Sequence, residues 1–224
     1  MIRAVLFDYD GVIVDSMHHH ARAWQRIFKK MGISITVEDI FLQEGRPTTD
    51  VVRFILQQHG RQADEETCRS IAKEKENMYI SQKPATVQPQ VIQLISDLRR
   101  SGLAVGLVTG SPYRSLTAVL PPALLAAFDV IITADDVARG KPAPDPYLAA
   151  AQKLKLDPGS CLVVENAPLG IQAAKAAGMK VIGITTTLPE QALNQADVVV
   201  RHFEELRELL LRKTKSLKFM TSDR

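Results

Sequence analysis

Two aspartates, Asp8 and Asp10, end a short apolar segment near the start of the chain. Carboxylates at positions i and i+2 of an extended chain project to the same side. Held that close they repel each other, so the arrangement is costly unless a proton or a cation lies between them. A hard divalent cation such as Mg2+ binds oxygen ligands of this kind. The spacing therefore indicates a magnesium site, with two solvated loop carboxylates as the alternative.

Three further sets of polar residues each follow an apolar segment in the same way. The first combines hydroxyls with a flexible glycine backbone, the second is a lysine followed by prolines, and the third pairs a carboxylate with an amide. Taken alone, each set has an ordinary explanation as a turn or a solvated side chain. Together with the two aspartates they predict four polar clusters at one edge of one sheet. The three sets are Thr109, Gly110 and Ser111; Lys141; and Glu165 and Asn166.

Short, continuous apolar segments separated by helical segments must position these residues. A continuous apolar segment, as opposed to an alternating one, is typical of a strand covered on both faces. Apolar residues over 91–98 recur at helical spacing and predict a helix that Gly102 ends. Alternating strands and helices predict an α/β fold, with a doubly wound, Rossmann-like parallel sheet and right-handed crossovers. The predicted strands are residues 4–7, 103–108, 130–133, 162–164, 181–184 and 198–200.

The region between the first two predicted strands contains no convincing strand. Apolar residues recur at helical spacing around Trp24 and again around Ile55, and a polar helical segment follows. Ligands bind an open α/β sheet at the carboxyl ends of its strands, so an insertion after the first strand lies over that site as a cap. The chain ends in a basic tail that we expect to fray. The expected units are a helical cap at residues 16–82, a core at residues 1–15 and 83–224, and the tail at residues 212–224.

With all four motifs in order, the chain resembles the haloacid dehalogenase-like superfamily over residues 2–208. Within it, the chain is similar to the branch with a helical cap between the first and second motifs. That branch includes β-phosphoglucomutase-like and phosphoglycolate phosphatase-like proteins. The resemblance implies a magnesium-dependent phosphohydrolase that acts on a small phosphate compound through an aspartyl-phosphate intermediate.

The resemblance also implies a role for each core residue. Asp8 attacks phosphorus, and Asp10 protonates the leaving oxygen and then activates the hydrolytic water. Thr109 and the Gly110 amide hold the phosphoryl oxygens, and Lys141 neutralises charge. An anionic nucleophile is repelled by an anionic phosphate, so cations and hydrogen-bond donors must gather around both.

The implied magnesium site departs from the family pattern. Its ligands are Asp8, the backbone carbonyl of Asp10 and the Glu165–Asn166 pair, where the family usually has two acids. Asn166 removes one negative charge, or alternatively only shapes the turn that follows. Glu44 stands where β-phosphoglucomutases have a lysine, and either offsets the missing charge near the metal or is solvated on the cap.

The candidate substrate-binding residues come mostly from the cap. His20 lies on a helix that is similar to that of β-phosphoglucomutases and is expected to gate or relay a proton beside the general acid. Arg46 and Lys75 are the candidates for holding a second phosphate. The full set is Gly110, Ser111, His20, Glu44, Gly45, Arg46 and Lys75.

Three alternatives to a simple phosphatase remain open. Thr48 stands where a mutase arginine is expected, which favours hydrolysis over a β-phosphoglucomutase-like phosphomutase. The Glu44 and Asn166 pairing suits an inorganic pyrophosphatase-like enzyme, because a small, highly charged substrate leaves room for a cap carboxylate. A catalytically impaired phosphate-binding or regulatory protein is the alternative that is not an enzyme.

Composition and charge limit the cellular environments and partners to be expected for this chain. The 224 residues are 46% hydrophobic and 24% charged, with a net charge of only +3. No apolar run approaches the ~20 residues of a membrane-spanning helix, and no basic, aromatic pattern points to nucleic acid. Cys68 and Cys161 lack the CxxC spacing of a redox or zinc motif. We expect a cytoplasmic protein, a monomer or weak dimer, whose partner is a small phosphorylated substrate.

Overall fold

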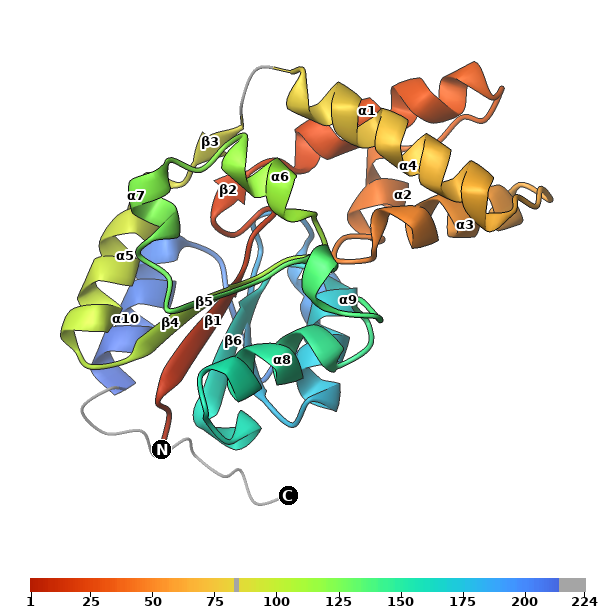
Figure 1. Ribbon diagram of the computed structural model, residues 1–224. Helices are drawn as coiled ribbons and strands as arrows, with labels where there is room; N and C mark the ends of the chain where they lie inside the picture. The colour runs from red at the N-terminus through yellow and green to blue at the C-terminus, as the bar shows by residue number, and fades with distance from the viewer. Residues whose placement is uncertain (83–84, 214–224) are drawn as a thin grey trace.

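The computed structural model of the protein describes residues 1–82 and 85–213. Its centre is a six-stranded parallel sheet with the strand order β5-β4-β1-β6-β7-β8 (Figure 1). All six predicted strands are confirmed, each within one residue at either end, and so is the doubly wound α/β fold. The strands are β1 (Ala4–Asp8), β4 (Ala104–Val108), β5 (Val130–Ile132), β6 (Cys161–Glu165), β7 (Lys180–Ile184) and β8 (Val198–Val200).

Helices cover both faces of the sheet (Figure 1). On one face lie α5 (Pro89–Arg100) and α10 (Phe203–Lys213), and on the other lie α8 (Asp145–Lys153) and α9 (Pro168–Ala176). Because both faces are covered, the strands need apolar side chains on both sides, which explains their continuous apolar sequences. The shorter helical segments are α6 (Tyr113–Thr117), α7 (Pro122–Leu125), and the 3-10 turns η1 (Ala134–Asp136), η2 (Pro158–Ser160) and η3 (Glu190–Leu193).

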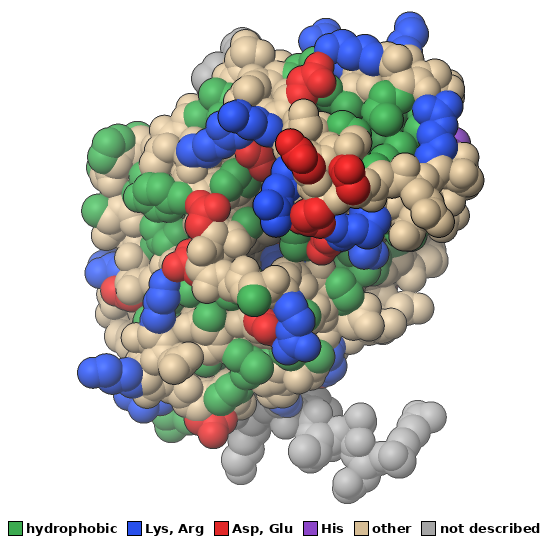
Figure 2. Space-filling model, turned by 45° about the vertical axis from the view of Figure 1, so that its right-hand side comes forward, with side chains coloured by type: hydrophobic (Ala, Val, Ile, Leu, Met, Phe, Trp, Pro, Cys, Tyr) green, Lys and Arg blue, Asp and Glu red, His purple; other side chains and the backbone are tan. Residues whose placement is uncertain are grey.

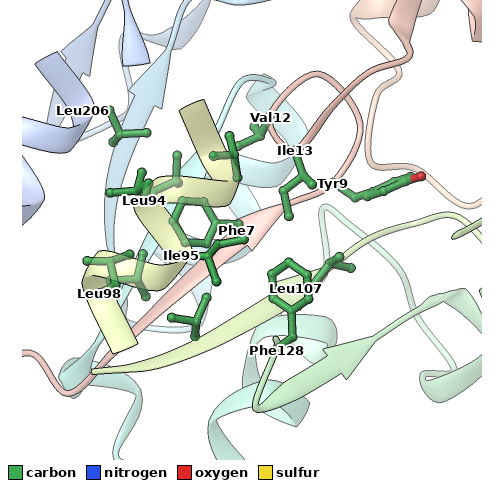
Figure 3. Packing of buried hydrophobic residues seen from close by; sticks show 14 of the residues in the cluster. Phe7, Tyr9, Val12, Ile13, Leu94, Ile95, Leu98, Leu107, Phe128 and Leu206 are labelled. Atoms are coloured by element: carbon green, nitrogen blue, oxygen red, sulfur yellow. The ribbon is translucent and has the colours of Figure 1, made fainter. Parts of the chain in front are cut away.

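The apolar side chains of the central strand β1 alternate between the two helix layers. Phe7 packs with Leu94 and Leu98 of α5 and Leu206 of α10, where their side chains point toward one another (Figure 3). Leu6, its neighbour, belongs to the cluster on the opposite face. Burying a side chain of this size contributes about 1.5–3 kcal/mol, so these two clusters fix the strand that carries Asp8.

The insertion after β1 is helical, as the sequence predicts, and forms a cap with an apolar core of its own (Figure 1). The spacing of Trp24, Phe28, Val52 and Leu56 places them on inward faces of two helices, where they pack together. Thr36 and Asp64 cap the helices that follow them by accepting backbone N–H bonds. The helices are α1 (Met17–Lys30), α2 (Val37–Phe41), α3 (Thr48–Gln58) and α4 (Glu65–Ile80).

A small antiparallel sheet at the cap junction was not expected from the sequence. In it β2 (Val14–Asp15), leading into the cap, pairs with β3 (Thr86–Val87), leading out of it. Two residues are too few to show a strand period, so the pattern of apolar residues could not reveal the pairing. The predicted return to the core at residues 83–84 lies outside the described residues.

Most of the predicted basic tail lies outside the part of the chain that the structure describes. Helix α10 is described as far as Lys213, and residues 214–224 are not described. Within the described ranges, none of the helices has the length and apolar character that crossing a membrane requires.

Candidate active site

The predicted site residues come together where the carboxyl ends of β1, β4 and β6 meet the cap. Asp8 pairs with Val108 in the sheet register, and Phe7 pairs with Val164, so the motifs that follow these strands lie around Asp8. A cavity of about 50 Å3 lies between core and cap at this edge. Hydrogen bonds link Lys141, Glu165 and Asn166 to the residues of this site. The predicted residues that line the cavity are Asp8, Asp10, His20, Glu44, Gly45, Arg46, Lys75, Thr109, Gly110 and Ser111.

Lys141 is a buried cation between two carboxylates. Its Nζ lies 2.5 Å from Oδ1 of Asp8 and 2.7 Å from Oε1 of Glu165. Burial disfavours the charged ammonium, but these two carboxylates hold the pKa of Lys141 well above its ordinary value. Burial also raises the pKa of Asp8, against the opposing charge of Lys141. One lysine thus does not balance the buried carboxylates, and the pocket favours a further cation.

Asp10 is held as a carboxylate by three hydrogen-bond donors. Its Oδ1 accepts from Ser16 Oγ at 2.6 Å and lies 2.9 Å from His20 Nε2, and its Oδ2 accepts from Ser111 Oγ at 3.0 Å. Burial opposes ionisation, but the charge and hydrogen bond of His20, together with Ser16, lower the pKa of Asp10 to about 2. These donors fix the orientation of the carboxyl group at the cavity wall.

A chain of contacts runs from Asp10 into the cap. Lys75 Nζ on α4 lies 2.7 Å from His20 Nδ1 on α1, and the His20 ring stacks on Tyr79 with centroids 4.0 Å apart. Because Lys75 donates to Nδ1, a neutral His20 carries its proton on Nε2 and donates it to Asp10. Burial is the main reason why the pKa of Lys75 falls to about 8, and burial also lowers the pKa of His20. The ammonium expected to hold a second phosphate is therefore already engaged with His20.

Glu44 reaches from the cap loop to the core. Its side chain is buried, at 6% exposure, and its Oε1 accepts a 2.8 Å hydrogen bond from Asn166 Nδ2. The same amide group donates to Thr187 Oγ1 at 2.7 Å. Burial raises the pKa of Glu44 well above its ordinary value, and Asp8 and Glu165 add to the rise. The alternative that Glu44 is solvated on the cap surface is therefore wrong.

Among the buried side-chain oxygen atoms without a hydrogen-bond partner are three that belong to predicted site residues. They are Oδ2 of Asp8, Oε2 of Glu44 and Oδ1 of Asn166. Unpartnered buried acceptors are costly, and carboxylate and amide oxygens are suitable ligands for a hard divalent cation. The residues therefore fit Mg2+, although residues 1–82 and 85–213 contain no group of three or more His, Cys, Asp or Glu side chains arranged to hold a metal. The set consists of two carboxylate oxygens and one amide oxygen.

Glu165 differs from the other predicted magnesium ligands, because its carboxylate is fully engaged with protein donors. Oε1 accepts from Lys141 and, at 2.8 Å, from the Tyr147 hydroxyl, while Oε2 accepts from the backbone N–H groups of Asn166 and Ala167. Glu165 therefore has no unpartnered oxygen of the kind found in Asp8, Glu44 and Asn166. In this structure Glu165 orients Lys141 toward Asp8.

Two predicted glycines mark the place where the cap loop lies directly on the core. A Cβ atom on Gly110 would be 2.6 Å from the carbonyl oxygen of Gly45. Gly45 itself has a φ of +84°, and a Cβ atom there would be 2.8 Å from Lys141 Cδ. Only glycine allows this close approach of loop to core. The two glycines therefore let the cap loop lie directly on the core beside Lys141.

Arg46 is the predicted cap cation that is least engaged. Its guanidinium lies over the Phe54 ring, with Cζ 5.1 Å from the centroid, and its Nε is buried without a hydrogen-bond partner. The rest of the cap wall includes the apolar side chains of Trp24, Ile40 and Val51. The cavity thus combines polar groups near Asp8 with an apolar surface on the cap.

Sequence reasoning missed three residues that support the site. Tyr147 holds Glu165, Thr187 holds Asn166, and Ser16 holds Asp10. Thr187 follows β7 at the same sheet edge, so the rule that found the other polar sets also applies to it. Tyr147 and Ser16 lie on or beside helices and carry no such signal.

Comparison with known proteins shows which family model, related proteins and solved structures this chain is similar to. The chain matches the model of the haloacid dehalogenase-like hydrolases over residues 2–178. Validoxylamine A 7'-phosphate phosphatase of Streptomyces hygroscopicus subsp. limoneus is 33% identical over 92% of this chain and 97% of that protein. Hexitol phosphatase A of Escherichia coli is 30% identical over 91% of this chain and 93% of that protein. The crystal structure of β-phosphoglucomutase from Clostridium difficile has a TM-score of 0.84 and 27% identity, and the match covers 96% of this chain and 97% of that one.

Proposed function

Because the chain belongs to the haloacid dehalogenase-like hydrolases, in their β-phosphoglucomutase-like branch with a helical cap, we propose that it is a magnesium-dependent phosphatase for a small, sugar-like phosphate compound. Its reaction passes through an aspartyl phosphate on Asp8. One observation carries the proposal: one Asp8 oxygen is bound by Lys141, and the other is buried, unpartnered and close to the fixed carboxyl group of Asp10.

In the first step an Asp8 oxygen forms a bond to phosphorus while the bond from phosphorus to the leaving oxygen breaks. This step requires protonated Asp10, so its proton has to be supplied when substrate binds, against the low pKa of Asp10 in the free protein. Asp10 then gives that proton to the leaving oxygen, and the product leaves as an alcohol. In the second step water attacks the same phosphorus, its proton passes to Asp10, and the bond to Asp8 breaks to release inorganic phosphate. Both steps need Asp10 at a fixed distance, which Ser16, His20 and Ser111 provide.

Thr109, the Gly110 backbone and Lys141 would hold the phosphoryl oxygens beside Asp8. Thr109 is buried at 3% exposure, and its Oγ1 accepts the Ser111 N–H at 3.0 Å, which orients the hydroxyl. Lys141 supplies a permanent positive charge at Asp8. Preorganised donors and charge of this kind lower the barrier because they need no rearrangement as the phosphoryl group transfers.

Asp8, the backbone carbonyl of Asp10 and Asn166 would hold Mg2+, with Glu44 adding its charge from the cap. When bound, the ion would supply the positive charge that lets a carboxylate approach an anionic phosphate. Glu165 contributes chiefly through Lys141.

At two cap positions where a mutase is expected to bind a second phosphate, the side chains make other contacts. Thr48 donates a hydrogen bond to Glu76 at 3.2 Å, and Lys75 is engaged with His20. Both contacts favour hydrolysis over transfer of the phosphoryl group to a second sugar oxygen. The buried contact between Glu44 and Asn166 favours a second candidate, an inorganic pyrophosphatase-like reaction.

A phosphate-release screen with Mg2+ tests these candidates. Its substrates are hexitol and ketose phosphates, β-glucose 1-phosphate, phosphoglycolate and inorganic pyrophosphate, each assayed with the wild type and Asp8→Asn. We expect release from sugar or polyol phosphates, lost in Asp8→Asn. Preferential release from pyrophosphate would replace the first candidate by the second, and no Asp8-dependent release from any compound would reject both.

The setting of the reaction is also a proposal. Cys68 and Cys161 are both buried free thiols, as is usual for a protein of a reducing compartment. A cytoplasmic enzyme, active as a monomer or weak dimer, is consistent with a site that core and cap of one chain complete between them.

A further inference from the structure

Outside the cavity, an ion pair joins the cap to the core. Arg114 of α6, a core helix, donates to Glu76 Oε2 of α4 through Nη2 at 2.6 Å and Nε at 3.2 Å. Its Nη1 also donates to Asn77 Oδ1 at 3.3 Å. The Glu76 side chain is 14% exposed and that of Arg114 is 45% exposed. Figure 2 shows acidic and basic side chains gathered on this face, where the cap meets the core.

Glu76 also holds the loop that lies over the site. Its second oxygen, Oε1, accepts a hydrogen bond from Thr48 Oγ1 at 3.2 Å. Thr48 is the first residue of α3 and directly follows the loop that carries Glu44 and Arg46. One carboxylate therefore connects a core helix with the cap loop, one oxygen to each.

The loop held in this way is tightly seated. A Cβ atom on Gly140 would be 2.4 Å from Pro47 Cγ, and a Cβ atom on Gly110 would be 2.6 Å from the carbonyl oxygen of Gly45. The cavity left beneath the loop is only about 50 Å3. A sugar phosphate needs more space than this, so we expect the loop to move away for substrate to bind and to return before phosphoryl transfer.

We propose that Glu76 is a positioning residue, which couples the contact between cap and α6 to the placement of the 44–48 loop over Asp8. When Arg114 binds Glu76 Oε2, the carboxylate is fixed with Oε1 toward Thr48, and the loop is held on Gly110 and Gly140. When the cap lifts from α6, Glu76 is released and the loop is free to move. Only the effect of this coupling on catalysis rests on the proposed function. The coupling itself is a property of the free protein.

Hydrogen–deuterium exchange of the loop amides in the free protein tests the coupling directly. The Arg46 N–H donates to Gln43 O at 3.1 Å and the Glu44 N–H to Phe41 O at 3.3 Å, so both amides report whether the turns of the loop stay folded. We expect Glu76→Gln and Arg114→Gln each to exchange about 3–10-fold faster here, because a partly exposed ion pair is of modest strength. The double variant should exchange no faster than the faster single variant, since both changes break one connection. Arg114→Lys, which keeps the charge, should restore most of the protection.

Glu74→Gln is the matched control. Glu74 is on the same helix but pairs with Lys30 within the cap, at 2.5 Å. It should exchange like the wild type at the loop, and amides of β1 should be unchanged in all variants. Equal loop exchange in the wild type and Glu76→Gln would overturn the proposal, and so would an equal increase in Glu74→Gln.

A second readout ties the coupling to ligand binding. Trp24, the single tryptophan of the chain, lines the cavity with Lys75 Nζ 5.2 Å from its ring centroid, so its fluorescence reports the cap. With inorganic phosphate and Mg2+ as the probe, Glu76→Gln should need about 3–10-fold more phosphate than the wild type for the same change in Trp24 fluorescence. With a substrate, kcat/KM should fall by a similar factor. If the loop amides respond as expected but the protein has no phosphatase activity, the coupling is supported and the proposed function is rejected.

Discussion

The contact between Glu44 and Asn166 allows the charge at the proposed magnesium site to be varied with little change of shape. Glu44→Gln keeps an oxygen that can accept the 2.8 Å hydrogen bond from Asn166 Nδ2, and removes one negative charge. Both side chains are buried, so solvent does not screen the loss. Loss of a ligand or of a group beside one typically costs about 10–100-fold in metal affinity, or about 1.4–2.7 kcal/mol. We expect Glu44→Gln to weaken magnesium binding by about that factor.

The reciprocal change provides a sharper test. In the double variant Glu44→Gln with Asn166→Asp, the amide and the carboxylate exchange places. The pair keeps its net charge and its hydrogen bond, now donated from the cap to the core. We therefore expect the double variant to recover most of the magnesium affinity, so that the two substitutions are strongly non-additive. Asn166→Asp alone places two carboxylates about 3 Å apart in buried surroundings, which should lower the unfolding temperature of the metal-free protein.

Magnesium binding by calorimetry is the main measurement, with magnesium activation of turnover as the second. Glu38→Gln is the control, because it removes a charge from an exposed position of α2 in the same part of the cap. It should titrate like the wild type. Wild-type magnesium affinity in Glu44→Gln would show that Glu44 does not act on the metal. A double variant as weak as Glu44→Gln would show that the position of the charge, and not its presence, decides the affinity.

Three further results follow from the site. Asp8→Asn should abolish turnover without loss of fold, measured by phosphate release and circular dichroism. Asp10→Asn should still allow phosphorylation of Asp8 by substrates with activated leaving groups, but should hydrolyse the intermediate slowly. Wild-type turnover in Asp8→Asn would refute the assignment of Asp8 as the nucleophile. EDTA should abolish activity and Mg2+ restore it, while Ca2+ should inhibit because its looser coordination tolerates a misaligned nucleophile; full activity after exhaustive chelation would remove magnesium from the mechanism. Gly140→Ala should lower kcat/KM by about 10–100-fold at a nearly unchanged unfolding temperature, because the new Cβ would lie 2.4 Å from Pro47 Cγ and displace the cap loop; unchanged kinetics would mean that the loop seats without this close contact.

The core of the fold could be predicted because its sequence patterns are local. Each strand is a continuous apolar segment, and the cap helices show helical spacing around Trp24 and Ile55, so tertiary contacts were not needed to recognise them. The β2–β3 pairing could not be predicted, since strands of two residues have no period.

The site could be predicted as a set of residues but not as a set of contacts. The rule that ligands bind at the carboxyl ends of parallel strands brought Asp8, Thr109, Lys141 and Glu165 to one place. Which of them touch depends on side chains that approach from positions far apart in the chain: Lys141 and Asp8 are separated by 133 residues. The family resemblance therefore implied a metal-ligand role for Glu165 but could not reveal its contact with Lys141. Whether Glu44 is solvated or buried depends on how the cap is seated, which no local pattern records.

The cap supplies charges that the core lacks, so we expect closure of the cap and binding of a cation to depend on each other. Glu44 adds a carboxylate to a pocket that already holds Asp8 and Glu165, with Lys141 between them. Like charges brought together in buried surroundings cost free energy unless a cation binds among them. A cation bound there stabilises the seated loop, and the seated loop raises the affinity for the cation by the same factor, since such coupling is reciprocal. Asn166 suits this arrangement better than a second acid would, because its amide nitrogen donates to Glu44 while its oxygen has no protein partner and can still accept a cation.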